Sequence, residues 1–69
     1  MEIIFTEHAK FQMNRRHIYK EDVVNTIKYP KKTYKVKGNY YSQKDIGRGK
    51  IEVVYEKDKY IKVITVYWI

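Results

Sequence analysis

The sequence of 69 residues contains no cysteine. No disulfide can therefore support its fold, and no thiolate chemistry is available to it. It also has no apolar run long enough for a signal peptide or a bilayer span, so we expect a cytoplasmic protein without a membrane partner. Linkers, internal repeats and low-complexity segments are absent as well. We expect residues 1–69 to form one compact domain with a modest core.

Metal ligands are scarce too. The only histidines, His8 and His17, fall on nearly opposite sides of a predicted helix, and a structural zinc site is not expected. Asp45, Glu52 and Glu56 form no recognisable acid pair, which argues against glycosidase-like chemistry. The sequence therefore predicts no metal site and no cofactor.

Acidic residues are few compared with basic ones. Fifteen Lys and Arg face eight Asp and Glu, which leaves a net charge of +7. Such an excess favours a polyanionic partner such as RNA, DNA, an acidic protein or an anionic membrane surface, although a merely solvated lysine-rich surface would look the same. The chain also holds eight tyrosines. Most are expected in the core or the sheet, but aromatic faces between lysines can also stack on unpaired bases.

Two helices are predicted in the first half of the chain. Thr6 is suited to an N-cap, and we expect the first helix over Glu7–Arg16. The second is expected over Lys20–Lys28, with acidic residues in its first turn and an apolar face that includes Val23. Pro30 ends it, because the residue before a proline is biased toward an extended conformation.

Beyond the second helix the apolar pattern alternates, as in strands. Gly38-Asn39 is a hairpin signal, and the last strand is apolar on both faces, which favours a central position. The predicted strands are Thr33–Lys37, Tyr40–Asp45, Ile51–Tyr55 and Tyr60–Trp68. Glu2–Phe5 is either a short opening strand or an extended lead-in. We expect an α+β fold, with two helices packed on one face of a four-stranded, mostly antiparallel sheet.

The polar face of the first helix carries the clearest chemical signal. At about 100° per residue, His8, Gln12, Arg15 and Arg16 fall in one sector. A titratable imidazole beside fixed positive charge can bind a phosphate and move a proton near neutral pH. In a small basic chain this combination points toward nucleic acid.

Spaced residues from Phe5 to Tyr67 carry a resemblance. They are His8-Ala9-x-x-x-Met13-x-x-Arg16-x-Ile18, Asp22-Val23, Pro30, Gly38, Lys44, Val53-Val54-Tyr55 and Ile64-Thr65-Val66-Tyr67. This order resembles the family catalogued as domain of unknown function 4258, which is similar to the barnase, colicin and RelE-like group of small ribonucleases. The usual family pattern has an arginine where this chain has Gln12, and a glycine is common where it has His17.

The resemblance implies metal-independent RNA cleavage on a RelE/barnase-like scaffold, by a toxin paired with an acidic antitoxin or immunity protein. We expect an endoribonuclease in which His8 acts as general base on a ribose 2′-OH, whose oxygen then attacks the adjacent phosphorus. A histidine that only hydrogen-bonds near the helix start is the plain alternative. Two other functions stay open: a non-catalytic RNA-binding module, and an interaction domain for an acidic protein.

Two cations, Arg16 and Lys44, are expected to act on the phosphate together with His8. Arg16 is expected to clamp the scissile phosphate, or else to form a salt bridge with Glu21 or Asp22. Lys44 lies within a predicted strand, where lysine is disfavoured unless its face is wet or functional. It is expected either to neutralise a phosphate oxygen or to be solvated.

Thr65 and Tyr67 share one face of the last strand, alongside Ile61 and Val63. Thr65 is expected to orient the substrate or His8. Tyr67 is expected to stack on a base or to protonate the leaving 5′-oxygen, unless it is a core tyrosine. The residues expected to contact RNA without taking part in catalysis are Gln12, Arg15, Lys31, Lys32, Lys35 and Lys37, with a solvated charged face as the alternative.

Overall fold

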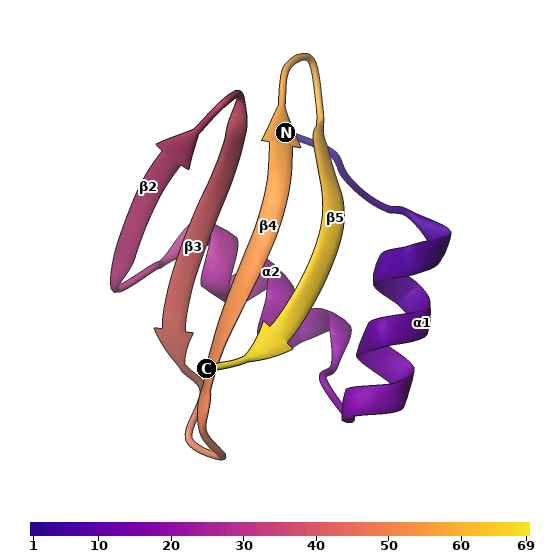
Figure 1. The fold of residues 1–69 in the computed structure, drawn as a ribbon, viewed down its shortest axis with the longest axis vertical. Helices are drawn as coiled ribbons and strands as arrows, with labels where there is room; N and C mark the ends of the chain where they lie inside the picture. Colours follow the sequence, from indigo (N-terminus) through magenta and orange to yellow (C-terminus); the bar gives the residue numbers. More distant parts are fainter.

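Both predicted helices form, and each spans the predicted residues. The computed structural model describes all 69 residues. Its elements, labelled in Figure 1 except for the short first strand, are β1 (Ile3–Phe5), α1 (Glu7–Arg16), α2 (Lys20–Lys28), β2 (Lys32–Val36), β3 (Asn39–Asp45), β4 (Lys50–Lys57) and β5 (Ile61–Trp68). The predicted α+β class is confirmed. No helix combines the length and the apolar character that crossing a membrane requires.

The sheet has five strands in the order β1-β5-β4-β3-β2, so the expected four-stranded sheet is one strand short. The added strand, β1, pairs in parallel with β5, from Ile3 opposite Ile61 to Phe5 opposite Val63, which makes the sheet mixed. Of the two alternatives for Glu2–Phe5, the short opening strand is therefore the one that forms, but a segment this short has too little periodicity to predict its pairing. β5 lies between β1 and β4, which confirms the central position that its apolar pattern predicted.

The β2–β3 hairpin turns one residue earlier than predicted. Val36 pairs with Asn39, so the turn is Lys37-Gly38 and Asn39 already belongs to β3. Lys37 and Gly38 have φ values of 50° and 85°. A two-residue hairpin turn of type I′ requires positive φ at both of its central residues. The turn signal was therefore real, but its register was wrong by one residue.

A register shift in β4–β5 changes which side chains share a face. The pairing slips where β4 passes from Val54 to Tyr55, so that Thr65 lies opposite Val54 while Val63 lies opposite Tyr55. Val63 is fully buried in the core together with Tyr55. Tyr67 stays in step with Thr65 and faces away from that core. Placing Thr65 and Tyr67 alongside Val63 was therefore wrong, because strict alternation does not hold across the irregularity.

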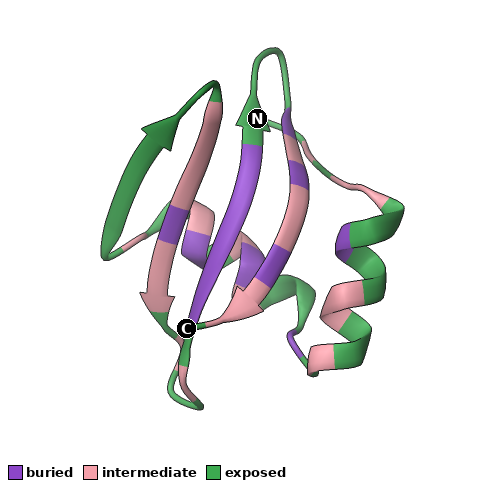
Figure 2. Ribbon diagram, in the orientation of Figure 1, coloured by how far each residue is buried: buried purple, intermediate pink, exposed green.

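One face of the sheet carries the core. α2 lies behind β3 and β4, and α1 runs beside β5 (Figure 1). Figure 2 views the molecule from the side that bears no helix, which we call the open face, and shows β4 as the most buried strand. The core cluster combines residues of both helices, the connection between them and three β4 and three β5 side chains: Ala9, Ile18, Val23, Ile51, Val53, Tyr55, Ile61, Val63 and Val66.

Hydrogen bonds at both ends of α1 attach it to β5. At the start of α1, the Thr6 hydroxyl accepts from the backbone N–H of Ala9 at 3.1 Å and donates to the carbonyl of Val63 at 2.9 Å. At its end, the indole N–H of Trp68 donates to the carbonyl of Arg16 at 2.9 Å. The helix is therefore held along the part of β5 that carries Thr65 and Tyr67.

The Thr6 cap can be tested by substitution. Thr6→Ala removes the side-chain hydrogen bonds to Ala9, Val63 and Ile64, and we expect it to lower the free energy of unfolding by about 1–2 kcal/mol. Thr6→Ser keeps the hydroxyl and should retain most of that stability. Urea denaturation of the three proteins measures the difference. Equal losses in both variants would show that the threonine methyl group, and not the cap, matters.

Candidate nucleic-acid interface

The strand register assigns a set of polar and aromatic side chains to the open face. Because side chains alternate across a strand, residues opposite one another in the ladder share a face. The set is Lys32 and Tyr34 on β2, Tyr41 and Gln43 on β3, Glu52 and Val54 on β4, and Thr65 and Tyr67 on β5.

Glu52 lies at the centre of this set and is only 5% exposed. Its Oε2 accepts from the hydroxyl of Tyr34 at 2.9 Å and from the amide Nε2 of Gln43 at 2.8 Å. Its Oε1 accepts from the hydroxyl of Tyr67. From the sequence, Glu52 was named only as a possible member of an acid pair. The overlooked signal was a carboxylate inside the otherwise apolar run Ile51–Tyr55.

These contacts keep Glu52 ionised. Burial alone raises the pKa of its carboxyl, but the hydrogen bonds from Tyr67, Gln43 and Tyr34 outweigh burial, with help from the charge of Lys32. The net result is a pKa below the ordinary value of 4.5. The pKa values of Tyr67 and Tyr34 shift in the opposite direction, upward. The pKa of Tyr67 is raised by burial and by its bond to Glu52, and the pKa of Tyr34 is raised chiefly by its own bond to Glu52. Both phenols stay neutral at physiological pH.

Two aromatic rings stack on the open face. The rings of Tyr34 and Tyr41 have centroids 5.1 Å apart and are inclined by 4°. Tyr34 remains 39% exposed although its hydroxyl is bound to Glu52. Its orientation is therefore fixed while part of the ring stays accessible, which is the property required of a platform for an unpaired base.

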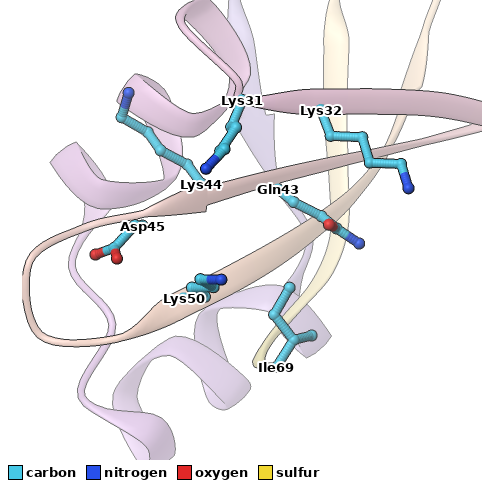
Figure 3. A pocket seen from close by; sticks show the side chains of 7 residues that line it. All are labelled: Lys31, Lys32, Gln43, Lys44, Asp45, Lys50 and Ile69. Carbon is cyan, nitrogen blue, oxygen red and sulfur yellow. The ribbon is translucent and has the colours of Figure 1, made fainter.

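A basic groove continues the open face past Glu52. It has a volume of about 340 Å³ and is lined by Lys31, Lys32, Gln43, Lys44, Asp45, Lys50 and Ile69 (Figure 3). We call it the lysine groove. Gln43 belongs both to its wall and to the hydrogen bonds of Glu52, so the groove and the tyrosines form one continuous surface.

The lysine groove carries more positive than negative charge, although Glu52 lies close enough to Lys32 for their charges to interact. The salt bridges of the structure lie elsewhere and join Lys10 to Glu7, Arg48 to Asp22 and Lys62 to Glu56. The ammonium of Lys44 donates to the carbonyl of Tyr29 at 2.8 Å and points toward α2 (Figure 3). The carboxylate of Asp45 accepts from the N–H of Gly47 at 2.8 Å. Lys31, Lys32 and Lys50 have no carboxylate partner.

On α1, the predicted site residues are only partly engaged. His8 is exposed, and its imidazole makes no hydrogen bond within the chain. The Nε of Arg16 donates to Oε1 of Gln12 at 2.7 Å. Arg16 forms no salt bridge with Glu21 or Asp22, and Asp22 pairs instead with Arg48 at 3.0 Å. Arg15 is exposed. Gln12 thus orients the one arginine that the hypothesis assigned to phosphate.

The expected catalytic residues do not all lie together. α1, which carries His8 and Arg16, runs along the segment of β5 that carries Thr65 and Tyr67. Lys44 lies opposite Ile51 on the helix-covered side of the sheet, apart from Tyr67. The structure therefore gathers the α1 and β5 candidates on neighbouring elements and separates Lys44 from them.

The remaining predicted RNA contacts divide between two regions. Lys31 and Lys32 line the lysine groove. Lys35 places its ammonium 5.1 Å from the ring centroid of Tyr40, and Lys37 is in the hairpin turn. No group of three or more His, Cys, Asp or Glu side chains is arranged to hold a metal ion.

Comparison with known proteins identifies the family. A family model described as Domain of unknown function (DUF4258) matches residues 5–68, and the chain therefore belongs to that family. The resemblance found in the sequence is confirmed to this extent. A search of curated proteins and a search of solved structures give no match. The family description names no activity, so the function must be argued from the residues.

The role of Glu52 predicts a pH dependence of stability. The folded-state pKa of Glu52 lies below the ordinary 4.5. The stability that its ionised carboxylate contributes is therefore complete above that pH. The contribution is lost as the pH falls below 4.5 and passes through the lower folded-state pKa. Glu52→Gln removes the charge and turns an amide toward existing donors, so it should lower the free energy of unfolding at neutral pH.

Urea denaturation from about pH 7 to about pH 3 measures this effect, and the deficit of Glu52→Gln should shrink toward the acid end. Glu56→Gln, on the same strand but exposed, serves as the control and should show a small change throughout. A deficit that stays constant over the whole range would contradict an ionised Glu52.

Proposed function

We propose that this member of the DUF4258 family binds single-stranded RNA across its open sheet face and cleaves it as an endoribonuclease. One observation carries the proposal. The accessible ring of Tyr34, stacked on Tyr41, lies on the same open face as the lysine groove, and the hydrogen bonds of Glu52 and Gln43 connect them.

Each part of this surface meets one part of an RNA strand. Every unpaired base has a π face that can stack on tyrosine, and the phosphates that follow need cations. The lysines that supply these cations form no salt bridge. Glu52 adds a negative charge to the surface, but it is buried and fully engaged by hydrogen bonds from Tyr34, Gln43 and Tyr67. The net charge of +7 attracts RNA at longer range.

Cleavage is assigned to the α1 side of the open face. The imidazole of His8 has no hydrogen-bond partner in the chain and is free to take the proton of a ribose 2′-OH. The 2′-oxygen then bonds to phosphorus, the bond to the 5′-oxygen breaks, and that oxygen leaves as a hydroxyl with a proton from the protonated imidazole or from water, so that a 2′,3′-cyclic phosphate remains. Arg16, held by Gln12, is suited to the charge that builds on the phosphate.

The structure changes the part given to Tyr67. Its hydroxyl donates to Glu52, and its pKa is raised. A tyrosine in this state is a weaker acid than a free one and does not suit protonation of the leaving oxygen. We assign Tyr67 a binding role beside Thr65 on β5. The toxin role extends the same proposal: an acidic antitoxin that covers the basic open face would exclude RNA from it.

RNA binding is predicted to depend on the ring of Tyr34. Tyr34→Ala removes the stacking surface and should weaken binding of a single-stranded oligonucleotide by about 1–3 kcal/mol. Tyr34→Phe keeps the ring and loses only the bond to Glu52, so it should bind much like the wild type. Fluorescence anisotropy at several salt concentrations measures both variants. Equal losses in Tyr34→Phe would show that the hydroxyl, not the ring, is what matters.

Cleavage is predicted to depend on His8. His8→Ala should reduce the rate of RNA cleavage by about 10²- to 10⁴-fold while leaving RNA binding nearly unchanged. His17→Asn is the matched control, because it removes the other imidazole and asparagine tolerates the left-handed backbone at this position (φ 56°). Gel analysis with chelator present separates the outcomes. Cleavage that persists in His8→Ala would exclude His8 as the base, and binding without any cleavage by wild type would identify a non-catalytic module.

A further inference from the structure

We infer that the lysine groove is a binding site for a phosphate monoester, and that on an RNA strand it takes a terminal phosphate. The statement about RNA rests on the proposed function, whereas the binding of a monoester does not. The inference starts from the groove's charge, volume and place on the sheet.

The lysine groove has an excess of positive charge. Four lysines and one aspartate line the groove, and the ammonium of one of the lysines, Lys44, donates to the carbonyl of Tyr29. Lys31, Lys32 and Lys50 have no carboxylate partner, and the Asp45 carboxylate is bound to the N–H of Gly47. Figure 3 shows that carboxylate on the side away from Lys32. Like charges gathered in one hollow repel, and a bound anion relieves that repulsion.

The positive charge of the groove favours a phosphate monoester over an internal phosphodiester. A monoester carries a charge of about −1.5 to −2 at neutral pH and presents three terminal oxygens, whereas an internal diester carries about −1. Lys31 and Lys32 reach the groove from the start of β2, and Lys50 reaches it from the start of β4. Cations arriving from two strands on flexible stems are able to surround a terminal group.

The lysine groove is large enough for a ligand bigger than a phosphate group. The groove's volume of about 340 Å³ falls in the range of small-molecule pockets, about 300–1,000 Å³, and exceeds what a phosphate alone requires. Ile69 adds an apolar wall. The amide nitrogen of Gln43 is bound to Glu52, which leaves the amide oxygen of Gln43 available to accept from a ribose hydroxyl. The ligand class that fits is a nucleotide carrying a terminal phosphate.

The lysine groove lies on the same open face as Glu52 and Tyr34. Lys50 precedes Glu52 by two residues on β4, so both belong to the open face. A strand stacked on Tyr34 and continuing past Gln43 would end in the groove. Glu52 is the other nearby anion, but it is buried and satisfied by its three donors.

A nucleotide titration tests the groove itself. Adenosine 5′-monophosphate, adenosine 3′-monophosphate and adenosine are added to the full chain while its backbone amides are followed by NMR. At least one monophosphate should bind about tenfold more tightly than adenosine and shift the amides of Gln43, Lys44 and Lys50. Lys50→Gln, with Lys31→Gln as a second variant, should abolish most of that preference. Lys59→Gln makes the same charge change in the β4–β5 turn at the other end of the strands, and should not.

A second arm uses short single-stranded oligonucleotides with a 5′-phosphate, a 3′-phosphate or neither. One phosphorylated form should bind wild type about tenfold more tightly, and Lys50→Gln should remove the difference. If no RNA binds but a monophosphate does, the proposed function fails and the groove stands. If RNA binds without regard to its ends, the terminal-phosphate role is overturned. If, in addition, no monophosphate binds better than adenosine, or Lys59→Gln matches Lys50→Gln, the groove assignment fails as well.

Discussion

The hydrogen bonding of one buried carboxylate organises the open face of this protein. Glu52 on β4 accepts from Tyr34 on β2, Gln43 on β3 and Tyr67 on β5, and thereby links four of the five strands. A buried charge is tolerated only when donors surround it. The three donors are therefore fixed in place, and the open face becomes a preorganised polar surface instead of a second apolar layer.

The two faces of the sheet differ in what they carry. The covered face holds the apolar core, and α1 is pinned beside β5 through Thr6 and Trp68. The open face is left for aromatic rings and lysines. This division explains why Lys44 lies apart from Tyr67, since its position in β3 turns its ammonium to the carbonyl of Tyr29, on the covered side.

Local signals predicted the helices but not the details of the sheet. The Thr6 cap, the acidic first turn of α2 and Pro30 are read within a few residues, and both helices form where expected. β1 is three residues long and exists because β5 offers it a free edge. The β4–β5 register shift depends on two strands at once, so straight alternation grouped Val63 with Thr65 and Tyr67, which lie on the other face of the sheet.

The sequence by itself determined the helices, the α+β class, the excess of positive charge and the family, because each depends on neighbouring residues or on composition. Only the tertiary structure decided the site. Tyr34, Gln43, Glu52 and Tyr67 lie on four different strands, and no spacing along the chain announces that they meet. The lysine groove likewise joins the starts of β2 and β4 with the end of the chain at Ile69. Strand order and register bring these groups together, and both are set by pairing between segments distant in the sequence.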